Sequence, residues 1–381
     1  MDKLVCRISD IGTVVGGGTP STKNPAYWGG EIPWISPKDL TDYKYTYISH
    51  GENYLTEKGM KSGTRLLPKD TVLFSSRAPI GYVALAANPI CTNQGFKSIV
   101  CDKNKVEPLY LYYYLKANLD YVKLFGTGAT FPEISGKTMG KIKVEIHKSL
   151  DDQHRIASIL STYDTLIENN TKRIRLLEKM AENLYKEWFV RFRFPGHEKV
   201  EMENGLPKGW SRGSLSEICE FRRGKNITSS EMREGAVPVV SAGITPSGFH
   251  TEANVHGTSV TMSSSGANAG FISIHYSDIW AADCSYIEET STPYIYYVYE
   301  LLNNIRSVIS NFQRGAAQPH VYPKDINRIK LIIPPKELRR KVNKIFEFIH
   351  KVIANFQKQN TLLARQRDLL LPRLMSGKLE V

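Results

Sequence analysis

The sequence of 381 residues lacks several features that would mark particular classes of protein. It has few cysteines: Cys6, Cys91, Cys101, Cys219 and Cys284 are odd in number and form no Cys-x-x-Cys pair, so neither a disulfide framework nor a zinc knuckle is indicated. No stretch approaches 18 uninterrupted apolar residues, and the amino terminus shows no apolar run before a small-residue cleavage site. We therefore expect a cytoplasmic protein with reduced thiols and no membrane partner.

The usual catalytic motifs are also missing. Gly16-Gly17-Gly18 is followed by Thr19-Pro20 and not by a helix start, so it is not a dinucleotide-binding loop. Asn24-Pro25-Ala26-Tyr27 is one residue away from the Asn-Pro-Pro-Tyr loop of amino-methyltransferases, but no cofactor-binding half precedes it. No Glu-x-Lys occurs, the histidines are scattered, and Ser263-Ser264-Ser265-Gly266 is not a nucleophile elbow. The sequence predicts no catalytic residue and no cofactor or metal ligand in this chain.

What the sequence does contain is one long apolar pattern that occurs twice, 186 residues apart. Its steps alternate between four and three, which is typical of a heptad seam. At about 1.5 Å per residue each helix would be about 50 Å long, so we expect the two helices to bury their seams against each other. The seam positions are Ile156, Leu160, Tyr163, Ile167, Asn170, Ile174, Leu177, Ala181, Leu184 and Trp188, then Val342, Phe346, Ile349, Ile353, Phe356, Asn360, Leu363, Arg367, Leu370 and Leu374.

Polar residues interrupt this seam at three places. Asn170 and Asn360 predict a hydrogen bond that fixes the helix register. Arg367 suggests the hypothesis that the helix pair opens there toward another protein.

The repeat extends beyond the helices. Asp10-Ile11 and Gly17 are answered by Glu217-Ile218 and Gly224 at an offset of 207 residues. The stretch 128–134 is answered by 315–321 at an offset of 187, so the second copy has lost 20 residues (207 minus 187) between these points. Matching ends around a divergent middle predict a variable module framed by fixed structural pieces.

The chain therefore divides into a first module (1–150), a long helix (151–194), a polar linker (195–207), a second module (208–335) and a second long helix (336–381). Short runs bounded by Gly and Pro predict strands in both modules, and one tyrosine-rich stretch in each predicts a buried helix. We expect Pro372 to kink or end the second long helix. The predicted fold class is α+β, with two pseudo-repeated globular domains joined by two long antiparallel helices that form a coiled-coil spacer.

An excess of basic residues, 50 Lys+Arg against 38 Asp+Glu, favours a polyanionic partner. Arg, Lys, Asn and Gln can address base edges in the major groove of DNA, whereas Ser and Thr hold phosphates. The candidate DNA contacts in the loops of the first module are Lys38, Arg65, Lys69, Arg77, Asn93, Gln94, Lys97 and Thr130. Those of the second module are Arg222, Arg223, Lys225, Ser263, Ser265, Asn268, Arg314, Gln318 and His320.

Six motifs resemble those of one family, and they span essentially the whole chain. They are Gly16–Ser21, Tyr27–Ile35, Gln153–Ala157, Tyr185–Phe189, Leu206–Trp210 and Leu374–Leu379. The first two resemble the opening of a target recognition domain in specificity (S) subunits of type I restriction-modification systems. The next three look like the central conserved region of that family, and the last looks like its carboxyl-terminal end.

This resemblance implies a non-catalytic reader of double-stranded DNA, with each target recognition domain reading one half of a split, asymmetric site. The paired helices would space the half-sites and dock two modification (M) subunits, which bind S-adenosylmethionine and methylate adenine. Restriction (R) subunits would join through the complex and use ATP and Mg. The second module lacks a Tyr-Trp-Gly-Gly stretch, so its loops near Gly224 do not map onto the first module, and unlike half-sites are expected.

Two other classes of function remain open. The chain could be a coiled-coil assembly scaffold whose end domains bind proteins, and binding that ignores DNA sequence even with M subunits present would favour it. It could also be the recognition portion of a single-chain restriction enzyme, against which the missing methylase and nuclease motifs argue.

Overall fold

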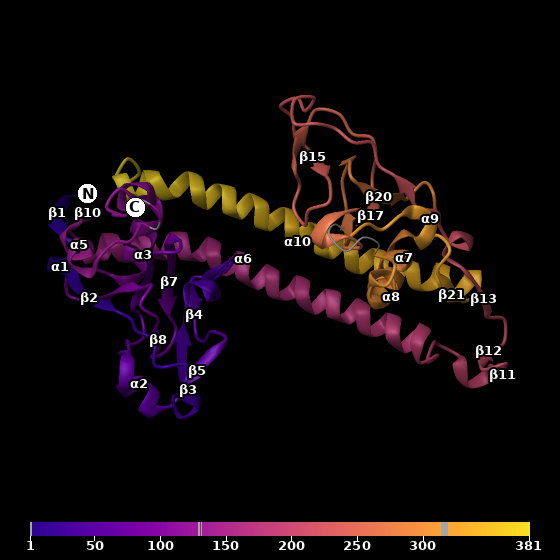
Figure 1. Cartoon of the computed structure of the whole chain (residues 1–381). Helices are drawn as coiled ribbons and strands as arrows, with labels where there is room; N and C mark the ends of the chain where they lie inside the picture. Colours follow the sequence, from indigo (N-terminus) through magenta and orange to yellow (C-terminus); the bar gives the residue numbers. More distant parts are fainter. Residues whose placement is uncertain (1, 129, 131, 314–318) are drawn as a thin grey trace. The chain divides into compact units, whose positions relative to one another are not determined.

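The computed structural model describes residues 2–128, 130, 132–313 and 319–381. The chain divides into two compact units, one formed by Met1–Asn170 with Gln359–Val381 and the other by Thr171–Lys358. Each unit holds one α+β module and part of two long helices, α6 (Leu150–Tyr185) and α10 (Lys336–Ser376) (Figure 1).

In the first unit the strands form sheets of order β2-β9-β6-β7-β4, β5-β3-β8 and β1-β10. The strands are β1 (Lys3–Arg7), β2 (Gly12–Gly16), β3 (Trp28–Ile35), β4 (Tyr47–Ile48), β5 (Asn53–Leu55), β6 (Val72–Ser76), β7 (Ile80–Ala86), β8 (Cys91–Thr92), β9 (Lys97–Cys101) and β10 (Lys143–His147). The short helices are α1 (Ile8–Ile11), η1 (Pro25–Tyr27), η2 (Pro37–Leu40), α2 (Glu57–Gly63), α3 (Pro108–Ala117), α4 (Leu119–Lys123) and α5 (Gly136–Lys141).

Helix α3 is the tyrosine-rich helix expected in the first module. Pro108 occupies its first turn, where the missing N–H costs no hydrogen bond. Tyr110 and Tyr113 are fully buried and share a core with Phe74 and Leu85 of strands β6 and β7. The helix therefore packs against strands β6 and β7 of the central sheet.

In the second unit the sheets have the order β14-β20-β17-β18, β16-β15-β19, β13-β21 and β11-β12. The strands are β11 (Met202–Glu203), β12 (Leu206–Pro207), β13 (Ser211–Ser214), β14 (Arg222–Arg223), β15 (Val237–Val240), β16 (Gly248–His250), β17 (Ser259–Ser263), β18 (Ile272–His275), β19 (Trp280–Ala281), β20 (Cys284–Glu288) and β21 (Lys330–Ile333). The helices are the π-helical turn η3 (Lys186–Val190), η4 (His197–Lys199), η5 (Leu215–Glu217), η6 (Gly266–Asn268), α7 (Ile295–Asn304), α8 (Arg306–Ser310) and α9 (Pro323–Ile326).

The two modules share strand order and register. The order β2-β9-β6-β7 corresponds to β14-β20-β17-β18, and β5-β3-β8 corresponds to β16-β15-β19. Each module also has a separate two-stranded sheet, β1-β10 in the first and β13-β21 in the second. In these sheets Leu4 faces Ile146 and Ser211 faces Ile333. Ser211 follows Leu4 by 207 residues and Ile333 follows Ile146 by 187, which are the two sequence offsets. The predicted duplication is confirmed at the level of backbone pairing.

The long helices pair in an antiparallel sense within each unit. In the first unit Asp164 is ion-paired with Arg367, and the Asn170 amide donates to Gln359 Oε1 at 3.2 Å. A later residue of α6 thus contacts an earlier residue of α10, as expected of antiparallel helices. All the predicted seam positions are buried or half-buried.

The same sense of pairing holds in the second unit. There the Arg173 guanidinium lies 5.6 Å from the centre of the Phe356 ring, and Ala181 shares a core with Ile349 and Ile353. Here too, a later residue of α6 lies beside an earlier residue of α10.

Two local features differ from expectation. Pro372 was expected to kink or end the second long helix, and the expectation of an end is wrong, because helix α10 continues to Ser376. Proline frees only one backbone carbonyl, which costs little within the last turns of a long helix. The stretch 195–207, expected to be a polar linker, contains the β11-β12 hairpin. Its turn residues Asn204 and Gly205 both have positive φ, at 52° and 76°, which is the two-residue turn that Asn-Gly favours.

Across the described ranges, 2–128, 130, 132–313 and 319–381, no helix has the length and apolarity needed to cross a membrane.

Candidate nucleic-acid interface

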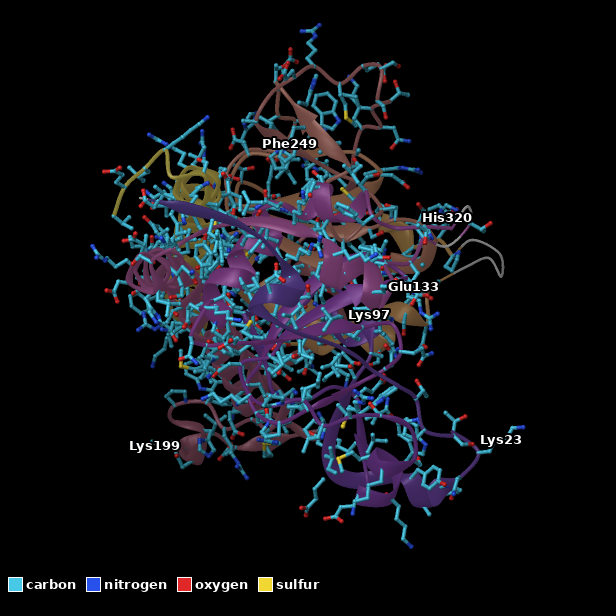
Figure 2. The ribbon with its side chains drawn as sticks, turned by 90° about the vertical axis from the view of Figure 1, so that its left-hand side faces the viewer. Lys23, Lys97, Glu133, Lys199, Phe249 and His320 are labelled. Carbon is cyan, nitrogen blue, oxygen red and sulfur yellow. The ribbon has the colours of Figure 1, made fainter. Side chains whose placement is uncertain are left out.

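In the first module, a polar cluster lies where β6 ends and β9 begins. The two strands are antiparallel neighbours, so Arg77, which follows β6, comes close to Lys97, which opens β9. Between them stands the Glu133 carboxylate, with Oε1 3.1 Å from Lys97 Nζ and Oε2 3.3 Å from Arg77 Nη1. Lys97 and Glu133 are labelled in Figure 2. One carboxylate therefore holds two cations where strands β6 and β9 meet the loops beside them.

The loop before β9 completes this cluster. The Asn93 side-chain oxygen accepts the backbone N–H of Gly95 at 2.8 Å, so this amide shapes the turn. Lys97 Nζ lies 3.2 Å from the Gln94 carbonyl oxygen, and the hydroxyl of Thr19 donates to the Gln94 side chain. Gln94 is exposed, whereas only 15% of the Lys97 side chain is. Arg77 and Gln94 are thus the members best placed to meet a ligand.

The other first-module candidates lie at different distances from this cluster. Lys38 follows Pro37, which packs against Gly95, and a hydrogen bond to Glu52 raises the pKa of Lys38. Arg65 is exposed just after α2. Lys69 is exposed at the opposite end of β6 from Arg77, so the structure does not bring Lys69 into the cluster.

Thr130 belongs to the segment between Thr127 and Glu133. The two ends of that segment form a β-bridge, with N···O distances of 2.9 and 3.1 Å. Thr130 is therefore close in sequence to the central carboxylate of the cluster.

In the second module the corresponding cluster is centred on Asp283. Arg223 Nη2 lies 3.9 Å from its Oδ1, and the hydroxyl of Ser265 donates to Oδ2. Lys225 Nζ lies 5.9 Å from the centre of the Trp280 ring. Arg222 is exposed, but neighbouring strand residues point to opposite faces, so it points away from Asp283.

The remaining second-module candidates are structurally engaged or lie outside the described residues. Ser263 is buried and donates its hydroxyl to the Ala242 carbonyl oxygen at 2.9 Å. His320 pairs by backbone with Ser265, and its ring stacks on Tyr322 at 6.0 Å. Asn268 closes the short η6 turn. Arg314 and Gln318 lie outside the described residues.

The two clusters occupy the same place in the repeated fold. The Ile134 N–H donates to the Ser76 carbonyl at 3.0 Å, and the Val321 N–H donates to the Ser264 carbonyl at 3.0 Å. Ile134 is therefore equivalent to Val321, and Ser76 to Ser264. The residues that precede the two donors are then equivalent, as are the residues that follow the two acceptors. Glu133 corresponds to His320, and Arg77 corresponds to Ser265.

A close backbone approach sets the glycine position beside each cluster. A Cβ on Gly17 would lie 2.1 Å from the Asn93 carbonyl oxygen, and one on Gly224 would lie 2.4 Å from that of Ala282. Any larger side chain would collide with the loop that carries the polar groups. The repeated glycine therefore has a structural cause in both modules.

Similar charge is built from different positions in the two clusters. Each cluster joins a carboxylate to a cation: Glu133 holds Arg77 and Lys97 in the first, and Asp283 lies near Arg223 in the second, where Lys225 lies over the Trp280 ring. The cations of the first come from the end of β6 and the start of β9, whereas those of the second come from β14 and the residues after it. The same scaffold therefore presents its donors in different places.

The sequence search missed the two carboxylates because it considered only residues that donate to bases or phosphates. The repeat contained a usable signal: His320 was a candidate, and Glu133 lies 187 residues before it. Thr19 was missed although it lies in the Gly-rich loop. Asp283 had no counterpart that could have pointed to it, because its position is a glycine, Gly95, in the first module.

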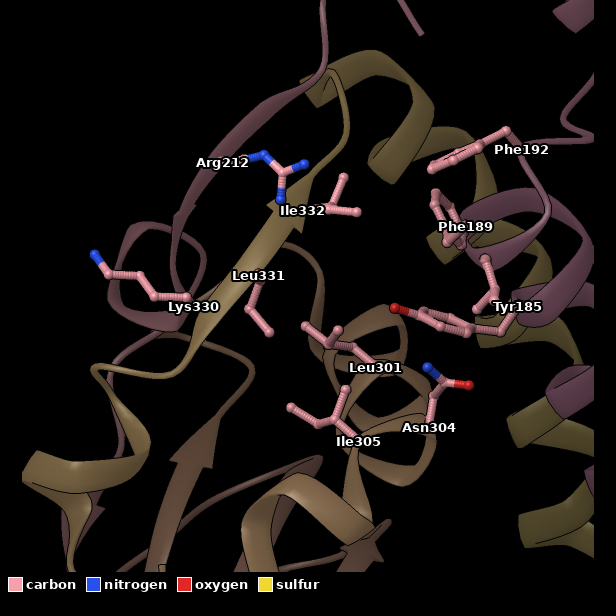
Figure 3. A pocket seen from close by; sticks show the side chains of 11 residues that line it. Tyr185, Phe189, Phe192, Arg212, Leu301, Asn304, Ile305, Lys330, Leu331 and Ile332 are labelled. Atoms are coloured by element: carbon pink, nitrogen blue, oxygen red, sulfur yellow. The ribbon is translucent and has the colours of Figure 1, made fainter. Parts of the chain in front are cut away.

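A groove of about 600 Å³ lies elsewhere in the second unit, between the end of α6, helix α7 and the β13-β21 pair (Figure 3). Its lining is mainly apolar, with Arg212 and Lys330 as its charged members. It offers no carboxylate, histidine or thiol that could act as a general base. In the described part of the chain, no group of three or more His, Cys, Asp and Glu side chains could hold a metal ion.

Comparison with known proteins gives consistent matches. The family model described as type I restriction modification DNA specificity domain matches residues 2–179 and again residues 207–365. The MjaIX type I restriction enzyme specificity subunit of Methanocaldococcus jannaschii is 36% identical over 409 residues, covering 99% of this chain and 93% of that protein. A putative type I specificity subunit of Mycoplasma genitalium is 26% identical over 318 residues and covers 82% of each chain. The crystal structure of a type I restriction-modification S subunit from M. genitalium shares the fold, with a TM-score of 0.69 and 21% identity over 98% of this chain and 96% of that one.

Proposed function

Since the chain belongs to the type I restriction-modification specificity-subunit family, we propose that it reads a split DNA site, one half-site per module. The observation that carries this proposal is the pair of clusters on one repeated scaffold. Equivalent backbone positions carry different polar side chains, Glu133 against His320 and Arg77 against Ser265. Different donors at equivalent places suit two half-sites of unlike sequence.

The charge of the chain supports DNA as the ligand. The net charge of +12 favours a polyanion, and both clusters combine cations with neutral donors that can reach base edges. We propose that the chain contributes recognition and no catalysis, so S-adenosylmethionine, ATP and Mg would be bound by partner subunits.

Docking of two M subunits, and of R subunits through them, is the second part of the proposal. The long helices keep large apolar side chains exposed, among them Leu176 (71%) and Leu362 (50%). These two leucines are 186 residues apart, at equivalent positions of α6 and α10. Two equivalent apolar positions suit two copies of one partner.

The reading function is tested by mapping adenine methylation in a methylation-free host that carries this chain with its neighbouring M subunit. We expect a split motif with two unlike halves, which disappears when the chain is deleted. Methylation that persists unchanged without the chain would favour the alternative of an assembly scaffold with protein-binding end domains.

The docking proposal is tested by counting M subunits per chain with native mass spectrometry. Leu176→Asp and Leu362→Asp should each remove one of two M subunits, and the double variant should remove both. Lys351→Ala, which changes an exposed cation on α10, is the matched control. Retention of two M subunits by the double variant would contradict docking at these positions.

A further inference from the structure

The Arg77 guanidinium is held by one carboxylate, and the Arg77 side chain is partly exposed. Its Nη1 donates to Glu133 Oε2 at 3.3 Å, and 38% of the side chain is exposed. Guanidinium carries five N–H donors in a fixed plane, so one bond to Glu133 leaves the edge formed by Nε and Nη2. Among the described residues no side chain bonds to that edge.

Glu133 is itself fixed before any ligand arrives. Its backbone exchanges two hydrogen bonds with Thr127, at 2.9 and 3.1 Å. The next residue, Ile134, is buried and bonds to the Ser76 carbonyl, directly before Arg77. Lys97 holds the second carboxylate oxygen at 3.1 Å. A carboxylate anchored on both sides can orient the guanidinium in advance, which lowers the entropy lost on binding.

The free edge of Arg77 matches one base. Two parallel N–H donors fit the O6 and N7 acceptors of guanine in the major groove, and no other base offers that pair. Gln94 lies in the same cluster but already accepts a hydrogen bond from Thr19. Arg77 is thus the side chain of the first cluster that has two parallel N–H groups without a bonded side chain among the described residues.

The second module cannot make this arrangement at the equivalent place. Ser265 stands where Arg77 does and donates its hydroxyl to Asp283. His320 stands where Glu133 does, stacked on Tyr322. Neither residue supplies a carboxylate-held guanidinium.

We propose that Glu133 is a positioning residue that presents Arg77 to a guanine in the half-site of the first module, an arrangement that the second module does not repeat at the equivalent positions, Ser265 and His320. This inference rests on the proposed function, because it assumes that the first module reads DNA. It adds the identity of one base and the pair of residues that select it.

The test uses the full chain assembled with its M subunits, S-adenosylmethionine and a DNA library in which every position of both half-sites is varied. Arg77→Ala should lower the preference for guanine at one position of one half-site by roughly 5- to 150-fold, the range typical of a bidentate contact. Arg77→Lys should lose the same preference, because an ammonium has no fork. Glu133→Gln, which keeps the shape and removes the charge, should cause a smaller loss at that position only.

The matched controls are Asp70→Asn and Lys103→Ala. Asp70 precedes β6 and Lys103 follows β9, so their ion pair, at 2.8 Å, lies at the ends of these strands that are far from the cluster. The two variants therefore break a similar ion pair on the same strands without touching the cluster. Both variants should keep the wild-type motif. The other half-site serves as an internal control in every variant, because its unchanged preference shows that the complex is folded and assembled.

Several results would overturn the inference. An Arg77→Ala variant that loses methylation equally on all sequences would make Arg77 a phosphate contact. Full guanine preference in Glu133→Gln would remove Glu133 from positioning, and loss at both half-sites would indicate a structural defect. A wild-type chain that directs methylation to no sequence would instead contradict the proposed function itself.

Discussion

Asp164 of α6 and Arg367 of α10 form an ion pair that is largely shielded from water, with 13% and 18% of the side chains exposed. The Tyr113 hydroxyl, from helix α3 of the first module, donates to the same carboxylate at 2.6 Å. Arg367 also lies 2.8 Å from Asp368 Oδ1. These contacts account for an arginine in an apolar seam within the unit itself, whereas the hypothesis that the helix pair opens near Arg367 toward another protein stays a prediction.

We predict that Asp164→Ala destabilises the first unit by about 3–5 kcal/mol, because it leaves a poorly hydrated guanidinium without its main partner. The double variant Asp164→Leu/Arg367→Met should lose less, since no charge is left unpaired. The measurement is the free energy of unfolding in urea.

A surface ion pair provides the control for that prediction. Lys351 pairs with Glu347 on α10, with 67% of the lysine side chain exposed. Lys351→Ala should cost less than about 1 kcal/mol. Equal losses for Asp164→Ala and Lys351→Ala would contradict the buried-pair account.

Adjacent glycines give a sharp stability contrast in the first module. Gly17→Ala should destabilise it by about 1–3 kcal/mol or more, because the new Cβ would overlap the Asn93 carbonyl oxygen, 2.1 Å away. Gly16→Ala should be nearly neutral, since the nearest atom to its Cβ is Lys97 Cδ at 3.9 Å. Thermal denaturation of the two variants checks this, and similar melting temperatures would contradict the close approach.

The same contrast is expected in the second module. Gly224→Ala should lower its stability for the same reason, with a carbonyl oxygen 2.4 Å from the new Cβ. Gly243→Ala is the milder comparison, because its new Cβ would lie 3.2 Å from the Thr245 carbonyl oxygen on an exposed loop, a contact that a small shift of the loop relieves. Equal losses would show that the two modules do not share this constraint.

The second module should lose stability in mild acid through His275. Burial lowers the pKa of its imidazole to about 4, and its Nε2 lies 2.8 Å from the Thr261 hydroxyl. As the pH falls below the unfolded pKa of about 6.5, the unfolded chain binds a proton that the folded chain does not. Stability is therefore lost progressively from about pH 6.5 down to about pH 4, by on the order of 2 kcal/mol at about pH 5.

The variant His275→Gln isolates this contribution, because glutamine does not titrate and can still bond to Thr261. Urea unfolding at about pH 7.5 and about pH 5 should show a smaller acid loss for the variant than for the wild type. Equal acid losses would exclude His275 as a source of the pH dependence.

Much of the fold could be predicted from the sequence because its strongest signals are periodic. Heptad steps predicted both long helices, and fixed offsets predicted the paired modules, whereas the pairing of Leu4 with Ile146 that matches these offsets emerges only in the structure. The Asn204-Gly205 hairpin was predictable from its turn chemistry, yet the polarity of the surrounding residues pointed to a linker. Helix α10 passes through Pro372 because few hydrogen bonds remain to be lost there.

The candidate site was less predictable, because its members meet only after the sheet has formed. Arg77, Lys97 and Glu133 are spread over 57 residues of sequence, from 77 to 133, and no local pattern joins them. Lys69 and Arg77 flank the same strand and look alike in sequence, but they lie at its opposite ends. The carboxylates of Glu133 and Asp283 accept hydrogen bonds but donate none. A prediction that considers only side chains able to donate to bases therefore misses them.

The measurement that tests the account most directly is the methylated motif of a chain whose second module has been replaced by a copy of the first. The register indicates the junctions: residues 4–146 would replace residues 211–333, because Leu4 faces Ile146 as Ser211 faces Ile333. We predict that this chain, assembled with M subunits, directs methylation to a motif with two copies of the first half-site. A folded, assembled chimera that still methylates the wild-type motif would contradict the claim that each module reads its own half-site.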